Sequence, residues 1–348
     1  MKSLRSYLPL LLLLLMLPVL SRAFTAAGDV FDLKLVVPGV YAALAKPFYK
    51  INCNAAVIVL DDGVMVVDTH SKPSAARALI QQIKTVTDKP VKYVVNTHFH
   101  WDHFRGNQEY PSAWPTGLEI VSSTTTRDNI EQYGIPRVKR EILDMPGEID
   151  GLKASLAKTT DAKKKAEIED NVRQAESYLS ELKSMQVVLP SVTFDRSLVL
   201  HGKTRTVELL WLGRAHTDGD VFVYLPNEKF LATGDALHEW TPFLNDGYPS
   251  DWIHTLEAAE KLDFDHSLGG HGGVMRGKSQ FQMWEQYLKD LMAETTTVYA
   301  SGGSIADAVK RVSPILARKY SSKMPDTFAV DVVPNIQKAY RVVSGQTE

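Results

Sequence analysis

The run THFHWDHFRGN, residues 97–107, constrains this chain more than any other stretch. It gathers three of the ten histidines and one aspartate in the pattern H-x-H-x-D-H. In extended chain, alternate side chains point the same way, so His98, His100 and Asp102 share one side and His103 turns away. Neutral imidazoles and carboxylates are ligands of divalent zinc. Two ligand faces on one short loop therefore predict two adjacent metals rather than a histidine-rich surface loop.

Three downstream residues can complete two coordination shells. His216 lies in GRAHTDGD between two predicted strands, Asp235 ends a predicted strand in ATGDALHEW, and His271 follows a predicted helix in LGGHGG. Glycines near each of them allow the backbone to approach a metal closely. Each residue alone is weak evidence, but together with the first cluster they predict a dinuclear site.

The order of apolar patterns predicts a layered α/β fold. Two apolar runs around Asp61-Asp62-Gly63 in NAAVIVLDDGVMVVDTH predict a β-hairpin. SAARALIQQIKTV has helical apolar spacing, and VKYVVNTH is a further strand. The histidine cluster follows this strand, and ligand sites in layered α/β folds favour such carboxyl ends. Strand patterns return in SVTFDRSLVLHG, RTVELLWLG, DVFVYLP and KFLATGD, before the helix WIHTLEAAEKL.

A polar, helix-prone stretch at about residues 124–185 interrupts the strands. One helix face there carries apolar residues at spacings of four and three, namely Ile168, Val172, Ala175, Leu179 and Leu182. Because this stripe is short, we expect a helical insertion packed on the main body rather than a free coiled coil. It is either a lid over the site or a spacer. A C-terminal helical extension is predicted at about 280–348, with helices around 280–299 and 304–319.

The N-terminus has the pattern of a secretory signal peptide, residues 1–23. Two basic residues precede an apolar run from Leu8 to Leu20, and the small residues Ser21 and Ala23 fit a cleavage site. A membrane-spanning helix needs about 20 apolar residues, so an uncleaved anchor is the weaker alternative. We expect one mature domain, residues 24–348, that is periplasmic or secreted and does not bind a membrane after cleavage.

Composition narrows the partners. The formal net charge is −2, and the chain lacks the basic balance typical of nucleic-acid binding. The single cysteine, Cys53, cannot form an intrachain disulfide. We therefore expect a small-molecule substrate and no nucleic acid, while the oligomeric state is not encoded in these patterns.

These motifs resemble those of the metallo-β-lactamase superfamily. The H-x-H-x-D-H run, the later H-T histidine, the TGD aspartate and the GHG histidine occur in that order, and VMVVDTH adds Asp68. The resemblance runs from about Val40 to Met275, apart from the insertion. It implies a four-layer αββα sandwich with the metals at one edge. It is more specific for the fold than for the substrate.

The resemblance also implies a role for each motif residue. The first metal would be bound by His98, His100 and His216. The second metal would be bound by Asp102, His103 and His271. Asp235 would bridge the two metals. Asp68 lies behind the ligands and orients their loop. The implied cofactor is two Zn²⁺, although other divalent metals also suit these ligands. Two zinc ions can share a hydroxide, and Asp102 is the catalytic residue expected to orient it.

Asp235 bears on the kind of reaction. β-Lactamases of this superfamily usually have cysteine or serine at the bridging position, whereas its thioesterases, lactonases and phosphodiesterases keep aspartate. We therefore expect a secreted two-zinc hydrolase that attacks an ester, lactone, thioester or amide carbonyl. A β-lactamase is one alternative, because secretion suits it. A metal-dependent oxygenase or a binding protein is another, although iron members resemble H-x-E-x-D-H and this chain has His100 at the glutamate position.

Four residues are candidates for a substrate pocket, and each has plain packing as its alternative role. Trp101 lies inside the H-x-H-x-D-H run, residues 98–103, which we name the metal loop. His238 closely follows the TGD motif. Tyr248 and Trp252 lie in NDGYPSDW. The remaining histidines are expected on the surface or in packing, namely His70, His201, His254 and His266.

Overall fold

The computed structural model describes residues 30–47, 50 and 53–347. The predicted signal peptide, residues 1–23, lies outside the described residues. Among the helices that are described, none is long and apolar enough to cross a membrane.

The first sheet has seven strands in chain order. Its strands are β1 (Phe31–Val37), β2 (Val40–Ala45), β3 (Ala55–Val59), β4 (Val64–Val67), β5 (Val91–Val95), β6 (Glu119–Ser123) and β7 (Val192–Phe194). The predicted hairpin is β3–β4, which pair antiparallel from Ala56 opposite Val67. Helix α1 (Pro73–Val86) then returns the chain so that β5 runs parallel to β4.

The second sheet has six strands in the order β13-β12-β11-β10-β9-β8. Its strands are β8 (Ser197–His201), β9 (Thr206–Leu210), β10 (Phe222–Leu225), β11 (Phe230–Gly234), β12 (His266–Gly269) and β13 (Val274–Arg276). Helix α7 (Pro249–Ala259) connects β11 to β12, which are parallel neighbours.

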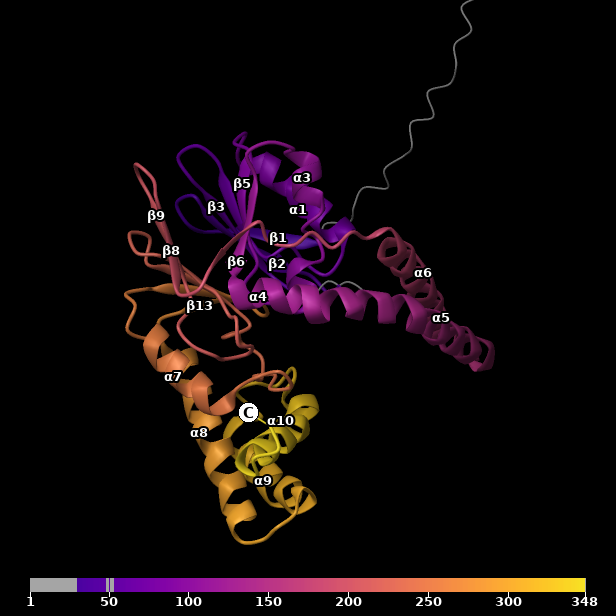
Figure 1. Cartoon of the computed structure of the whole chain (residues 1–348). Helices are drawn as coiled ribbons and strands as arrows, with labels where there is room; N and C mark the ends of the chain where they lie inside the picture. Colours follow the sequence, from indigo (N-terminus) through magenta and orange to yellow (C-terminus); the bar gives the residue numbers. More distant parts are fainter. Residues whose placement is uncertain (1–29, 48–49, 51–52, 348) are drawn as a thin grey trace, which may run out of the picture.

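The two sheets pack face to face, with helices on both outer sides (Figure 1). Valine, leucine and alanine side chains of both sheets form the central core. Helices α1 and α3 (Glu109–Ala113) cover the first sheet. Helix α7 and three C-terminal helices cover the second sheet in the largest apolar cluster. This four-layer arrangement confirms the predicted αββα sandwich.

Residues 124–185 form a helical hairpin between β6 and β7. It comprises α4 (Thr124–Asn129), the π-helix η1 (Ile130–Gly134), α5 (Ile135–Lys158) and α6 (Ala162–Ser184). Ala175, Leu179 and Leu182 of the α6 stripe pack against α5 in a small core of their own, separate from the cores of the sandwich. Figure 1 shows α5 and α6 extending away from the sheets.

The C-terminal helices are α8 (Ser279–Ala300), α9 (Ile305–Tyr320) and α10 (Phe328–Val343). The first two follow the predicted ranges closely, and Ser304 and Asp307 form a capping box at the start of α9. Helix α10 was not predicted as a separate helix, because Pro334 interrupts its pattern. Burial of its apolar face in the largest core outweighs that penalty.

Candidate metal centre

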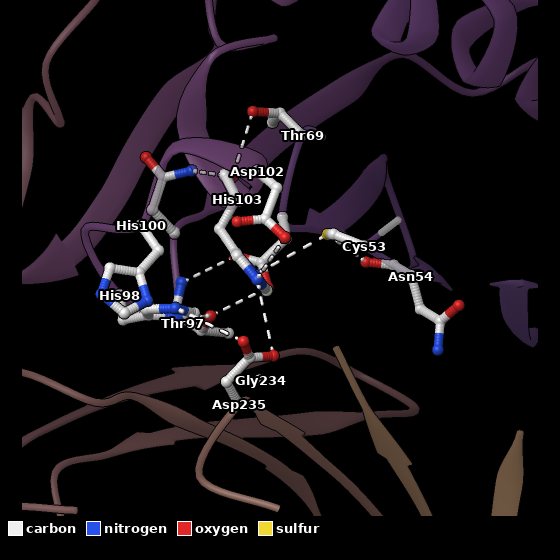
Figure 2. Close-up of polar contacts among 12 residues, drawn as sticks. Cys53, Asn54, Thr69, Thr97, His98, His100, Asp102, His103, Gly234 and Asp235 are labelled. Carbon is white, nitrogen blue, oxygen red and sulfur yellow. Dashed lines mark hydrogen bonds and ion pairs between the residues drawn. The ribbon is translucent and has the colours of Figure 1, made fainter. Parts of the chain in front are cut away.

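The carboxyl ends of parallel strands bring the predicted ligands to one edge of the sandwich. The metal loop and the short helix α2 (Trp101–Phe104) follow β5, Asp235 follows β11, and His271 follows β12. Figure 2 shows the side chains of the metal loop facing Asp235 across the two sheets. The seven candidate ligands are all buried, namely His98, His100, Asp102, His103, His216, Asp235 and His271.

These side chains form two groups whose ligand atoms lie within 4.8 Å of one another. The first group contains His98, His100, His216 and Asp235, and the second contains Asp102, His103 and His271. This division is the same as the one that the sequence motifs imply.

The carboxylate of Asp235 faces both groups. Its Oδ1 lies 3.5 Å from His103 Nε2, and its Oδ2 lies 3.6 Å from His216 Nε2 and 3.2 Å from His271 Nε2. Gly270 permits this approach, because a Cβ there would lie 2.1 Å from Asp235 Oδ1. Asp235 is therefore placed where a bridging ligand would be needed.

Hydrogen bonds fix the tautomers of the neutral rings of His216 and His103. His216 Nδ1 lies 3.1 Å from the Phe243 carbonyl oxygen, which can only accept, so Nδ1 carries the hydrogen. His103 Nδ1 likewise donates to Asp68 Oδ2 at 2.8 Å. In the neutral form of each ring, the lone pair then lies on Nε2, the nitrogen that faces Asp235.

Asp68 extends the same control to His98. The carboxylate accepts hydrogen bonds from the Thr97 amide and from the Thr97 hydroxyl, both at 2.8 Å. Because the hydroxyl hydrogen points to Asp68, Thr97 Oγ1 accepts from His98 Nδ1 at 3.0 Å. The lone pair of His98 Nε2 is then available to a metal. Asp68 adopts a φ of 65°, a strained conformation for a residue other than glycine. It thus lies directly behind two candidate ligands.

His100 uses its other nitrogen. Its Nε2 donates to Asp246 Oδ2 at 2.9 Å, so Nδ1 carries the lone pair. That Nδ1 lies 2.8 Å from His216 Nε2, a nitrogen that also carries a lone pair and no hydrogen in the neutral ring. Two lone pairs so close repel one another unless a cation lies beside them. The arrangement fits a positive ion held by His100 and His216.

Unpartnered polar atoms test the fit of a metal independently. Within the described residues, His98 Nε2, His103 Nε2 and Asp235 Oδ1 are buried without a hydrogen-bond partner. Such atoms carry a free-energy cost of about 1–3 kcal/mol each unless a partner binds them. All three converge between the two ligand groups. The residues present therefore fit a pair of divalent metal ions, and a nitrogen and oxygen donor set suits zinc.

The pKa shifts of three candidate ligands suit a metal, and those of two others show where a metal would compete with a proton. Burial lowers the pKa of His98 far below its usual value and that of His216 to about 3, so both rings are neutral at pH 7. Burial opposes ionisation of Asp235, but the adjacent rings of His271 and His103 hold the pKa of that carboxyl well below its usual range. Burial opposes protonation of His103 and His271, but nearby groups that include Asp235 raise the pKa of both rings. Neutral imidazoles and an ionised carboxylate are the forms that bind metal.

Cys53, which the motifs did not single out, lies beside the centre. Its Sγ is 3.7 Å from His103 Nδ1, a nitrogen whose hydrogen goes to Asp68. Burial raises the pKa of the Cys53 thiol to about 12, and the thiol donates to the Asn54 carbonyl oxygen at 2.8 Å. A protonated, buried thiol packs behind the ligand and is a poor nucleophile.

A cavity of about 1020 Å³ opens beside His100. Two of the four pocket candidates, Trp101 and Tyr248, line it. Much of its wall comes from the insertion, through Gln132, Tyr133, Gly134, Pro136, Arg137, Arg140, Glu141, Asp144 and Glu148. The C-terminal helix α10 contributes Lys338.

The other two pocket candidates lie elsewhere. Trp252 is fully buried on the inner face of α7, where its Nε1 donates to the Ala236 carbonyl oxygen at 2.9 Å. His238 is also buried, with its ring 4.7 Å from the Trp284 ring and 5.2 Å from the His271 ring. Neither lines the cavity, because both side chains point from the loop after β11 or from α7 toward the C-terminal helices.

The remaining histidines are in packing or on the surface. His70 is buried and stacks on Phe31 with ring centroids 4.1 Å apart. His201 and His254 are exposed, and His266 is half-buried.

Known proteins resemble this chain in sequence and fold. Residues 49–267 match a family model described as the metallo-beta-lactamase superfamily. A linear primary-alkylsulfatase of Pseudomonas sp. (strain ATCC 19151) is 22% identical over 250 residues, covering 68% of this chain. This chain spans only 44% of that relative.

Two solved structures share the fold. A metallo-beta-lactamase from Pontibacter korlensis matches with a TM-score of 0.54 and 16% identity, over 74% of this chain and 99% of that chain. A crystal structure of VMB-1 matches with a TM-score of 0.50 and 16% identity, over 75% of this chain and 97% of that chain. At this identity the likeness concerns the fold alone.

Proposed function

Because the chain belongs to the metallo-beta-lactamase superfamily, we propose that it is a two-zinc hydrolase of an ester, lactone, thioester or amide. The observation that carries this proposal is the pair of ligand groups around Asp235, with unpartnered buried atoms between them. His100 occupies the position of the glutamate in the H-x-E-x-D-H pattern of iron-binding members. This difference favours zinc hydrolysis over oxygen chemistry. The convergent ligands also favour an enzyme over a binding protein without turnover.

Asp102 is the proposed catalytic residue. Zinc, when bound, lowers the pKa of a coordinated water toward about 7 and polarises the bond to be cleaved. Asp102 Oδ2 lies 3.7 Å from both His103 Nε2 and His271 Nε2, and the side chain is buried. From this position its carboxylate can orient the attacking water and hold the proton that the water loses.

The insertion is proposed to select the substrate rather than to act as a spacer. Its π-helix and α5 form a wall of the cavity beside His100. Arg105, two residues after His103, is buried and pairs with Glu141 of α5 at 2.7 Å. Tyr178 of α6 accepts from Arg105 and donates to Glu141 at 3.1 Å. The position of the wall is therefore tied to the metal loop.

A sulfate ester is the second candidate substrate. The observation that favours it is the match to a protein named linear primary-alkylsulfatase. The charge of the cavity wall does not itself select an anion, because Arg137, Arg140 and Lys338 share the wall with acidic residues. These acidic residues are Glu141, Asp144, Glu148, Asp218 and Asp246. A β-lactam stays an alternative that Asp235 disfavours.

Elemental analysis of the purified protein beside Asp235→Ala tests the proposal. We expect about two zinc ions per chain, as in two-metal hydrolases, and a lower zinc content in the variant. A panel of carboxylic esters, lactones, thioesters, alkyl sulfates and nitrocefin then identifies the substrate class. Bound iron, or no metal after reconstitution with zinc, would contradict a zinc hydrolase.

We also propose that the protein is exported, on the pattern of residues 1–23. N-terminal sequencing of protein recovered from a secreting host should begin just after Ala23. A cytoplasmic product that still begins at Met1 would contradict this.

A further inference from the structure

Two candidate ligands of the first metal rest on one irregular loop. This loop, residues 236–248, connects β11 to α7, and we name it the support loop. His216 Nδ1 donates to its Phe243 carbonyl oxygen at 3.1 Å, and His100 Nε2 donates to its Asp246 carboxylate at 2.9 Å. The support loop therefore sets which nitrogen of each ring is available to a metal.

One side chain of helix α10 holds this loop from behind. The Asn335 amide donates to the Pro242 carbonyl oxygen at 2.7 Å and accepts from the Leu244 amide at 3.3 Å. These two contacts lie on either side of Phe243. Asn335 is 1% exposed and also donates to the Tyr287 hydroxyl at 3.0 Å, so its orientation is fixed within the bundle.

A second residue at the start of α10 reinforces the contact. Thr327 Oγ1 accepts from the Thr241 amide at 2.9 Å. Residues 241–244 belong to no helix or strand, so their backbone groups depend on such side chains for partners. Side chains at the start of and within helix α10 thus supply the backbone hydrogen bonds that neighbouring strands supply in a β-sheet.

We infer that Asn335 is a positioning residue for the first metal, which makes the C-terminal helix part of the metal centre. The chain of contacts runs from Asn335 through Phe243 and Asp246 to His216 and His100. This inference rests on the proposed two-metal function. Outer contacts of this kind keep a ligand ring in the orientation and tautomer that binds metal.

The supports of the second metal group do not pass through Asn335. His103 is held by Asp68 from the first sheet, and His271 stacks on Trp240 with ring centroids 4.5 Å apart. Trp240 lies in the support loop, but its carbonyl oxygen accepts from Trp284 of α8, and the amide that follows it donates to Thr327 rather than to Asn335. Loss of Asn335 is therefore expected to weaken one metal site and spare the other.

Competition of the full-length protein with a zinc chelator tests this selectivity. We expect Asn335→Leu to weaken one of two zinc affinities by roughly tenfold or more and to leave the other unchanged. Asp246→Ala, which removes the contact to His100 directly, should weaken the same site. The matched control is Tyr340→Phe, which removes a hydrogen bond of α10 to the Gly303 carbonyl oxygen, far along the chain from the support loop.

The outcomes separate this inference from the proposed function. A folded Asn335→Leu protein with both zinc affinities unchanged would overturn the inference, while the wild type still showed two zinc ions. Equal weakening of both sites, or the same effect in Tyr340→Phe, would also overturn it. If Asn335→Leu does not fold, Asn335→Ala carries the test, because it removes the same amide contacts without adding volume, and the same loss is expected at the first site. A wild type without zinc would overturn the proposed function itself.

Discussion

Two helical additions flank the metal centre, and they act on it in different ways. The insertion, α4 to α6, contributes side chains to the wall of the cavity. Among the C-terminal helices, α8 and α10 hold the support loop through hydrogen bonds to its backbone. One addition thus supplies much of the cavity wall, and the other, apart from Lys338 on that wall, lies mainly behind the candidate ligands.

The difference extends to their cores. Helices α5 and α6 bury their apolar residues mainly against each other. Helices α8 to α10 share one apolar cluster with the second sheet and α7. We conclude that the insertion is separable from the sandwich, whereas the C-terminal helices are part of its fold.

Removal of α10 is expected to have the largest effect. Ending the chain at residue 323 removes Phe328, Val332, Ile336 and Ala339 from the largest core. Truncating a single large core side chain costs about 2–5 kcal/mol, and a whole protein has a stability of about 5–15 kcal/mol. Circular dichroism should show no cooperative thermal unfolding. A truncated protein that unfolds cooperatively and binds two zinc ions would break the comparison.

Removal of the hairpin is expected to change substrate use and to leave the metals in place. Replacing residues 137–182 with a short glycine and serine linker is feasible, because Val138 and Leu182 lie in the same small core. Zinc content should equal that of the wild type, while KM or the substrate range changes. Unaltered kinetics for every substrate would show that the insertion is only a spacer.

The Arg105–Glu141 ion pair tests whether the hairpin is held against the metal loop, and its loss is expected to have a smaller effect. Glu141→Gln leaves the buried Arg105 guanidinium without its carboxylate, and breaking such a pair costs about 3 kcal/mol. The control is Glu148→Gln, an exposed residue on the same helix and the same cavity wall. Urea unfolding should show a lower midpoint for the first variant only. Equal midpoints would mean that the ion pair does not hold the hairpin.

The sequence was sufficient for those parts of the site that lie in local motifs. Alternation placed His98 and His100 together and His103 apart from them, as the structure has them. It also placed Asp102 with His98, which was wrong, because the chain turns into helix α2 at Trp101 and Asp102 joins the group of His103. The apolar strand patterns also predicted that these ligands lie at the edge of the sandwich where the strands end. The apolar stripe of α6 predicted a helix packed on the main body, but its buried residues pack mainly on α5, because a stripe on one helix does not identify the helix that covers it.

The parts that escaped prediction depend on contacts between distant residues. Asp246 meets His100, and Asn335 meets the support loop, through side chains with no local pattern. Trp252 was expected near substrate because of its segment, but the period of α7 turns it inward. Proximity in sequence to Asp235 was equally misleading for His238, since the chain turns it toward Trp284.

The most direct test of the account is anomalous X-ray diffraction at the zinc absorption edge from crystals of the zinc-loaded protein. We predict two peaks, about 3.5–4 Å apart as in two-metal hydrolases. One peak should lie among His98, His100 and His216, and the other among Asp102, His103 and His271, with Asp235 between them. A single peak, or peaks away from Asp235, would contradict the dinuclear centre on which the account rests.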